Sequence, residues 1–205
     1  MEERKQEATI NGTPLTVLGS KVSVGAVATD VELLEYVLCP FKLLADTAGK
    51  IRVISVVPCI DTGLCEMQTL RISEEARRFN DQVVAITIST DVPASLERWC
   101  GRTGVDNVLM LSDHLNMNFG AAYGTWLKEM RSEQRSIFVV DANNIVRHAE
   151  YVPEVGHAIN YEAALAAIRE LLAASEPAAQ SVQGFSERPT SKEADSNHDR
   201  LGNNS

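Results

Sequence analysis

The sequence predicts an α/β sandwich formed by a single domain. Three apolar runs rich in β-branched residues alternate with helix-like segments, and a hairpin and a closing helix follow them. Strands that alternate with helices in this way are typical of a parallel sheet with right-handed crossover connections. The length of 205 residues suits one domain with a sizeable hydrophobic core, and the sequence shows no internal repeat.

The sequence of the N-terminal region predicts a mobile end followed by a β-hairpin. Residues 1–6 are mostly charged, and we expect them to be mobile. Residues 8–10 and 15–18 are the expected strands, because Asn11 and Gly12 between them form the strongest short hairpin signal. We therefore expect the folded domain to begin with an antiparallel pair.

The sequence in the centre of the chain predicts strands that alternate with helices. Apolar, β-branched runs predict strands at residues 51–57, 81–89 and 105–111. Helix-like patterns and start signals predict helices at residues 64–80, 93–100 and 118–123. Gly101 is the expected end of the second of these helices. Two weaker segments are residues 31–36, either a strand or a turn of helix, and residues 41–46, a short helical turn.

The C-terminal part of the domain predicts a second hairpin and a closing helix. Residues 136–140 and 145–150 are apolar runs on either side of a polar turn. Residues 160–172 carry one apolar stripe at helical spacing, and Asn160 is the expected N-cap.

The composition changes at residue 175. Beyond it Pro, Ser, Gln, Asn and charged residues dominate, and such a segment buries too little apolar area to offset its ordering entropy. We therefore expect one folded domain at residues 7–174 and a disordered tail at residues 175–205.

The charge balance argues against two classes of partner. With 28 acidic and 19 basic residues the net charge is −9, which disfavours binding to nucleic acid or to an anionic membrane surface. The charged N-terminus lacks the apolar core of a signal peptide, and no apolar run reaches the length of a membrane span. We therefore expect a cytoplasmic protein, whose thiols are kept reduced.

The four cysteines are accordingly expected to be inert or catalytic. A disulfide framework does not fit a reducing compartment, and neither the cysteines nor the four histidines show the close spacing of metal ligands. We expect no metal site.

One cysteine lies where a thiol becomes reactive. Pro58 ends an apolar strand because it has no N–H for the ladder, and a helix begins near Cys65. Unpaired N–H groups and the positive end of the helix dipole favour an anion in a first helical turn. Cys65 is therefore the candidate nucleophile, since the thiolate is the reactive form. The alternative is that Cys65 is a small, inert core residue.

The residues around Cys65 form a known pattern. Pro58, Thr62 and Cys65 make up Pro-x-x-x-Thr-x-x-Cys, which resembles the active-site motif of the peroxiredoxins. Residues 55–65 as a whole resemble the bacterial thiol peroxidase branch of that family.

Three further segments carry the same resemblance, which covers about residues 8–174. Residues 98–101 resemble the segment that contains the resolving cysteine, and residues 10–17 resemble the N-terminal hairpin. Arg135, six residues before Asp141, matches the active-site arginine of the family.

The resemblance implies a thioredoxin-like fold, with a central mixed β-sheet, helices on both faces and an added N-terminal hairpin. It implies a peroxidase for hydrogen peroxide and alkyl hydroperoxides, with Cys65 as the peroxidatic and Cys100 as the resolving cysteine. The Cys65 sulfenate would condense with Cys100 to an intramolecular disulfide, which thioredoxin would reduce. The resemblance also implies a homodimer and no cofactor.

The two catalytic cysteines are not expected to touch in the reduced form. They lie 35 positions apart on different predicted helices. A disulfide needs Cα atoms within about 7 Å. We therefore expect unwinding around Cys65, or movement of the Cys100 segment, before the bond forms.

The resemblance also implies roles for three neighbours of Cys65. Arg135 would place a cation beside the sulfur, Thr62 would bond the thiolate and the peroxide, and Pro58 would shield the site from water. Each has a simpler interpretation. In that interpretation Pro58 only ends a strand, Thr62 is a helix N-cap, and Arg135 is a surface residue at a strand start.

Apolar residues near the motif are candidates for the substrate pocket. They could line a site for an alkyl hydroperoxide together with the N-terminal hairpin, or they are ordinary core. These candidates are Leu64, Met67, Trp99 and Phe119.

Cys59, six residues before Cys65, leaves two interpretations open. It is either a small residue that faces the interior of the loop or a second partner for the Cys65 sulfenate. Cys39 has no assigned role.

Two rival functions remain. One is a redox-sensing or binding module of the same fold, in which oxidation of Cys65 signals to a partner. The other is a general disulfide reductase, which the absence of a Cys-x-x-Cys pair disfavours.

Overall fold

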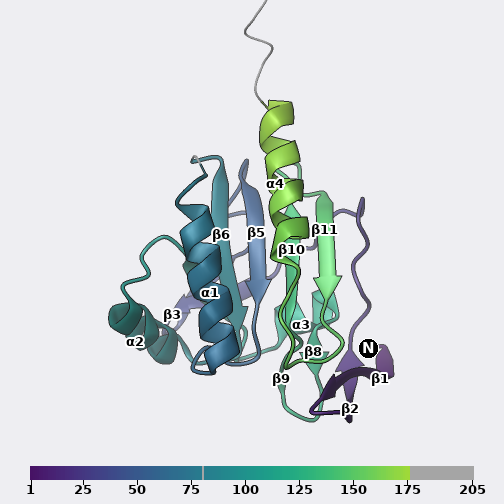
Figure 1. Ribbon diagram of the computed structural model, residues 1–205. Helices are drawn as coiled ribbons and strands as arrows, with labels where there is room; N and C mark the ends of the chain where they lie inside the picture. The colour runs from purple at the N-terminus through teal and green to yellow at the C-terminus, as the bar shows by residue number, and fades with distance from the viewer. Residues whose placement is uncertain (80, 176–205) are drawn as a thin grey trace, which may run out of the picture. The chain divides into compact units, whose positions relative to one another are not determined.

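The computed structural model describes residues 1–79 and 81–175, and within them the α/β class is confirmed. The centre is a seven-stranded sheet (Figure 1), ordered β11 (Val146–Tyr151), β10 (Ser136–Val140), β5 (Ile51–Val56), β6 (Val83–Ser89), β7 (Leu109–Ser112), β3 (Glu32–Tyr36) and β4 (Cys39–Lys42). β5, β6 and β7 are parallel, and the other neighbouring strands are antiparallel. The sheet is therefore mixed, as expected. From residue 176 onward, the predicted tail lies outside the described residues.

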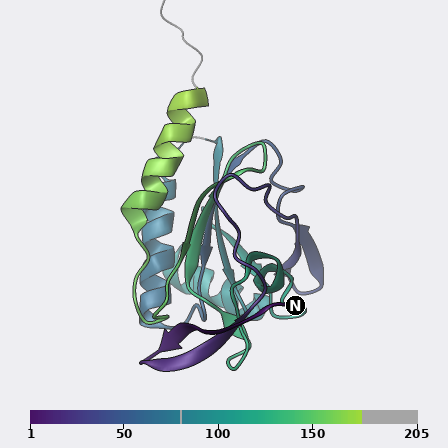
Figure 2. The ribbon, with the colours of Figure 1, turned by 90° about the vertical axis from the view of Figure 1, so that its right-hand side faces the viewer.

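Helices pack on both faces of this sheet. The helices α1 (Gly63–Ala76), α2 (Pro93–Thr103) and α4 (Tyr161–Ser175) cover one face, and the short α3 (Asn118–Tyr123) packs on the other. Figures 1 and 2 both show α1 and α4 side by side. β5 is buried along its whole length, so Val53 packs beneath α1, α2 and α4 while the next residue, Ile54, packs on the α3 side.

A second, smaller sheet contains the predicted N-terminal hairpin. Its order is β1 (Glu3–Ile10), β2 (Thr13–Leu18), β8 (Trp126–Leu127) and β9 (Ser132–Glu133). Asn11 and Gly12 both have positive φ, 49° and 75°, as the tight hairpin turn requires. The hairpin is therefore confirmed, whereas β8 and β9 were not predicted, because two residues are too few to show a strand period.

The first strand begins earlier than expected. Residues 3–6 belong to β1, where Glu3 pairs with Leu18, so the expectation of a mobile segment there is wrong. The reason is a tertiary contact. The Arg4 side chain donates from Nε to the carbonyl of Gly19 at 2.8 Å, and composition alone cannot reveal such a bond.

The end of α2 also differs from the prediction. The helix continues through Gly101 and ends at Gly104, which has φ 73° and donates its N–H to the Cys100 carbonyl at 2.8 Å. Only glycine adopts this left-handed conformation without a steric penalty, so Gly104 is the C-terminal cap.

The segment before β5 is a hairpin followed by turns. Phe41 of β4 pairs with Leu33 of β3. The short helical turn expected at residues 41–46 is present only after the strand, where the Asp46 N–H donates to the Lys42 carbonyl at 3.0 Å. The remaining elements are present, but β7 begins only at Leu109 where a strand was expected from residue 105, and α1 ends at Ala76 rather than near residue 80. The Asn160 side chain caps α4 by accepting the N–H of Ala163 at 3.2 Å. No helix among the described residues is both long and apolar enough to cross a membrane.

Candidate active site

Cys65 lies in the first turn of α1, directly beyond the carboxyl end of β5. Pro58 closes the strand, a turn follows, and Thr62 is the N-cap residue of the helix with extended backbone angles. The Cys65 side chain is fully buried. The predicted strand-turn-helix setting of the thiol is therefore present, with the helix N-terminus directed at the sulfur.

Two polar groups reach the Cys65 sulfur. The Thr62 hydroxyl lies 2.9 Å from Sγ, and the Arg135 guanidinium donates to Sγ from Nη2 at 3.4 Å. Hydrogen bonds and a fixed positive charge stabilise an anion more than a neutral thiol. Both donors therefore face the atom that attacks a substrate when it is ionised.

Thr62 does not cap the helix with its side chain. Its hydroxyl makes no bond to a helix N–H, and it instead contacts the Cys59 carbonyl at 3.2 Å and Cys65 Sγ at 2.9 Å. A hydroxyl has one proton and two lone pairs, so it can donate to a thiolate or accept from a thiol. Thr62 is therefore the N-cap residue, as the simpler interpretation has it, but its hydroxyl contacts the Cys65 sulfur rather than a helix N–H.

Arg135 is held in place by its other donors. The side chain is 2 % exposed, Nε donates to the Val155 carbonyl at 3.0 Å, and Nη1 donates to Oε1 of Gln68 at 2.8 Å. The Gln68 amide in turn donates to Ser55 Oγ of β5 at 2.8 Å. Arg135 is therefore a buried and oriented cation rather than the surface residue of the simpler interpretation.

These residues meet at one cavity of about 500 Å³. Five residues that the sequence analysis singled out line it, namely Pro58, Thr62, Leu64, Cys65 and Arg135. The cavity is further lined by Ile10, Cys59, Thr90, Asp91, Met130, Ser132, Val155 and Gly156. Its wall is more apolar than polar, so it can receive an organic group next to the sulfur.

The structure corrects the other three pocket residues. Met67 is 63 % exposed on α1, and Trp99 is buried in the core with its indole N–H donating to Glu66 Oε2 at 3.0 Å. Phe119 is buried on the opposite face of the sheet and stacks on Tyr123 at 4.2 Å. Sequence shows that these residues are apolar but not which face of the sheet they cover.

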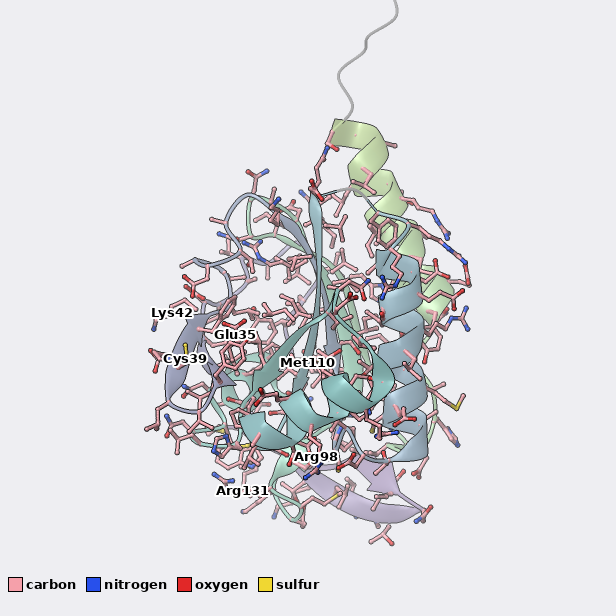
Figure 3. All side chains as sticks on the ribbon, turned by 90° about the vertical axis from the view of Figure 1, so that its left-hand side faces the viewer. Glu35, Cys39, Lys42, Arg98, Met110 and Arg131 are labelled. Atoms are coloured by element: carbon pink, nitrogen blue, oxygen red, sulfur yellow. The ribbon has the colours of Figure 1, made fainter. Side chains whose placement is uncertain are left out.

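Cys100 lies in a different cavity from Cys65. This cavity of about 780 Å³ lies between α2, the end of α1 and the sheet, and Ala76, Leu96 and Met110 line it with Cys100. Figure 3 looks at the molecule from the side of α2 and labels Met110 together with Glu35, another lining residue. All four cysteines are free, and burial raises the pKa of the half-buried Cys100 thiol.

Cys59 shares the cavity of Cys65 and contacts an acid. Its sulfur lies 3.4 Å from Oδ1 of Asp91, whose other oxygen accepts the N–H of Ile60 at 2.7 Å. Burial, and then the charge of Asp91, raise the pKa of the Cys59 thiol. Cys59 is therefore favoured in its protonated form, in the same cavity in which the Cys65 sulfur faces hydrogen-bond donors.

Sequence reasoning missed several residues of the site. Gln68 lies three positions after Cys65, so helical spacing could have placed it on the same face of α1. Asp91 lies two residues before the helix predicted at residues 93–100, and the sequence indicated for it only a part in the start of that helix. Ser132, whose hydroxyl donates to the Pro58 carbonyl at 2.7 Å, belongs to no recognisable sequence pattern. Within the described part of the chain, no group of three or more potential ligands could hold a metal ion.

Comparison with known proteins agrees with this geometry. The family described as Redoxin matches residues 23–165. A thiol peroxidase of Bacillus subtilis is 46 % identical over 166 residues, which span 81 % of this chain and 98 % of that protein. A thiol peroxidase of Staphylococcus aureus is 41 % identical over 80 % of this chain and 99 % of that protein.

Two solved structures have the same fold. A peroxiredoxin-like protein from Aquifex aeolicus aligns with a TM-score of 0.74 at 24 % identity, over 83 % of this chain and 99 % of its own. A thiol peroxidase from Chromobacterium violaceum aligns with a TM-score of 0.72 at 19 % identity, over 82 % and 98 %. The chain thus belongs to the Redoxin family and, within it, to the thiol peroxidases, which makes it a peroxiredoxin-type peroxidase.

Proposed function

We propose that this peroxidase reduces hydrogen peroxide and alkyl hydroperoxides with Cys65 as the attacking group. The observation that carries the proposal is the Cys65 sulfur at the wall of a cavity, bonded to both Thr62 and Arg135. The thiolate attacks the terminal peroxide oxygen, an S–O bond forms, and the O–O bond breaks. The alkoxide takes up a proton and leaves as the alcohol, or as water when the substrate is hydrogen peroxide.

Arg135 stabilises the charge that develops during this attack. Negative charge moves from sulfur to the leaving oxygen, and a fixed guanidinium beside the sulfur can donate to both positions. Its bonds to Gln68 and Val155 fix its orientation before the substrate arrives. No reorganisation is then needed in the transition state.

The walls of the cavity support organic peroxides as substrates. Ile10, Leu64, Met130 and Val155 give it an apolar surface near the sulfur. Pro58, whose carbonyl accepts the Ser132 hydroxyl, lines the same cavity as Cys65, where its ring would limit the entry of water.

The second half of the cycle uses Cys100. The Cys65 sulfenic acid condenses with the Cys100 thiol, an S–S bond forms, and water leaves. The two residues line separate cavities, so the first turn of α1 or the α2 segment has to move before the bond can form. An external dithiol such as thioredoxin then reduces the disulfide by exchange.

The cellular setting forms part of the same proposal. Four free thiols fit a reducing cytoplasm. Exposed apolar side chains on and near α1, among them Met67, Leu70 and Met130, fit a homodimer through the face near the active site.

A single-turnover measurement tests the proposal. One equivalent of cumene hydroperoxide is added to the reduced protein, and we expect rapid consumption and a mass loss of two hydrogens. Cys65→Ser should abolish the reaction, whereas Cys100→Ser should still consume one equivalent. A Cys65→Ser protein that reacts as fast as the parent would disprove the assignment. A redox-sensing module would react once but would not turn over with thioredoxin and its reductase.

A further inference from the structure

The active-site cavity contains a second thiol that the proposed cycle does not use. Cys59 and Cys65 both line the cavity of about 500 Å³, whereas Cys100 lines the separate cavity between α2 and the sheet. Cys59 is half-buried and Cys65 is fully buried. In the reduced enzyme, Cys59 is therefore the thiol that shares the space in which the Cys65 sulfenic acid forms.

Thr62 brings the two cysteines close together. Its N–H donates to the Cys59 carbonyl at 3.3 Å, so the chain between them turns back on itself. Its hydroxyl contacts the same carbonyl at 3.2 Å and Cys65 Sγ at 2.9 Å, so that carbonyl oxygen and the sulfur lie within about 6 Å of each other.

The surroundings of the two sulfurs differ in charge. Cys65 faces the guanidinium of Arg135, and Cys59 faces the carboxylate of Asp91 at 3.4 Å. The first contact places a fixed cation and a donor at the Cys65 sulfur, and the second, together with burial, raises the pKa of Cys59. A peroxide in the cavity therefore meets one sulfur beside a cation and one sulfur beside a carboxylate, and we expect it to react at Cys65.

We propose that Cys59 is a second resolving cysteine, which captures the Cys65 sulfenic acid inside the cavity as a Cys59–Cys65 disulfide. The inference rests on the proposed peroxidase function of Cys65. The Cys59 sulfur attacks the sulfenic sulfur, an S–S bond forms, and the S–O bond breaks. The hydroxyl leaves as water with the Cys59 thiol proton, so no further oxidant or reductant takes part.

The movement required is local. The Cα atoms of a disulfide lie within about 7 Å, which a shift of the turn from Cys59 to Thr62 can achieve. The shift breaks the contacts of Asp91 with Cys59 and Ile60. It also disturbs the bonds from Thr62 to the Cys59 carbonyl and the exposed ion pairs of Asp61 with Arg98 and Arg102. Cys100 must instead leave its own cavity. The local disulfide then protects Cys65 from further oxidation until the Cys100 thiol displaces Cys59 by exchange.

The positions of the arginines make the two disulfides easy to distinguish. Trypsin cleaves after Arg52 and Arg71, so Cys59 and Cys65 fall in one peptide, residues 53–71. Cys100 falls in another, residues 99–102. A Cys59–Cys65 bond makes the first peptide lighter by two hydrogens, whereas a Cys65–Cys100 bond joins the two peptides.

The experiment compares two variants in a Cys39→Ser background, which removes the exposed thiol on the edge strand β4 (Figure 3). Cys100→Ser and the double variant Cys59→Ser/Cys100→Ser receive one equivalent of cumene hydroperoxide and then dimedone, which labels sulfenic acid. We expect the single variant to yield the lighter peptide, and the double variant to show about fivefold more dimedone adduct on Cys65. Both variants keep Cys65, Thr62 and Arg135, so both should consume the first equivalent, and its rate is recorded for each.

The result that would overturn the inference is equal dimedone labelling of both variants with no lighter peptide from Cys100→Ser. That result, obtained while Cys65 still consumes one equivalent, leaves the peroxidase proposal intact. Failure of Cys65 to consume peroxide in either variant would refute the peroxidase proposal itself, and the role of Cys59 with it.

Discussion

Two buried arginines lie near opposite ends of the paired strands β5 and β10, and their side chains donate hydrogen bonds to different kinds of partner. Arg52 is fully buried and donates to Thr47 Oγ1 and to the carbonyls of Leu44, Thr47, Lys50 and Asp141. All of its partners are neutral oxygens of the surrounding chain, so its charge serves to hold the loop before β5.

Arg135 is almost as buried, but its N–H groups are divided between oxygens of the surrounding chain and a reactive sulfur. Nε and Nη1 fix the side chain to Val155 and Gln68, and Nη2 is directed at the Cys65 sulfur on the wall of a cavity. Burial of a cation is therefore no sign of function. The informative feature is a donor directed at a reactive atom in a space that a substrate can enter.

The sharpest test of this contrast is Arg135→Ala. Loss of the donor and the charge should lower the second-order rate constant for peroxide about 10²–10³-fold, the effect of removing one strong transition-state donor. Stopped-flow consumption of one equivalent measures it. A decrease of less than about threefold would show that Arg135 is structural like Arg52.

Arg52→Ala is the matched control at the other end of the sheet. It removes every hydrogen bond that this buried guanidinium donates, so we expect the free energy of unfolding to fall by about 3 kcal/mol. Urea denaturation measures this loss. The rate constant per folded molecule should remain that of the parent, and a large decrease would mean that the two ends of the sheet are coupled.

Thr62→Val should have the next largest effect. It keeps the shape but removes the hydroxyl that contacts Cys65 Sγ at 2.9 Å. A hydrogen bond to a charged group contributes about 1.5–3 kcal/mol, so we expect a rate decrease of about tenfold to hundredfold. Thr62→Ser keeps the hydroxyl and should recover most of the rate. Equal rates for the two variants would contradict this role.

The smallest predicted effect concerns two buried acids, Glu133 and Asp113. They extend the comparison of the buried arginines to buried groups of negative charge. Glu133 is fully buried, its Oε2 accepts the Thr125 hydroxyl, and burial, followed by the charge of Asp113, raises its pKa well above the ordinary value of 4.5. Burial raises the pKa of Asp113 as well.

Because the folded-state pKa of Glu133 lies above the unfolded one, its contribution to stability is fully present below about pH 4.5 and is lost as pH rises through the folded value. Glu133→Gln cannot ionise, so its free energy of unfolding should decline less from pH 4.5 upward. Urea denaturation of both proteins at several pH values measures the difference. Parallel pH profiles would show that Glu133 does not titrate differently on folding.

The sequence could predict the local part of the site. Pro58, Thr62 and Cys65 lie within one turn, so their spacing determines their geometry once strand and helix are recognised. Arg135 came from a family resemblance, because 70 positions separate it from Cys65. Nothing in its local pattern distinguishes it from Arg52.

The rest of the site depends on packing that a one-dimensional pattern does not contain. Val155, Ser132 and Ile10 reach the cavity from three separate segments. Trp99 and Phe119 were expected there because they are large and apolar, yet they belong to the cores on the two faces of the sheet. Apolar character predicts burial, and only the topology decides which core receives the side chain.

The residue after Cys65 has a consequence of its own. Glu66 accepts the indole N–H of Trp99 at 3.0 Å and also contacts Arg102, so the first turn of α1 is tied to the helix that carries Cys100. Any unwinding that moves Cys65 toward Cys100 must withdraw this carboxylate from the indole. The fluorescence of Trp99 should therefore change with each oxidation, giving the enzyme an intrinsic optical signal for its redox cycle.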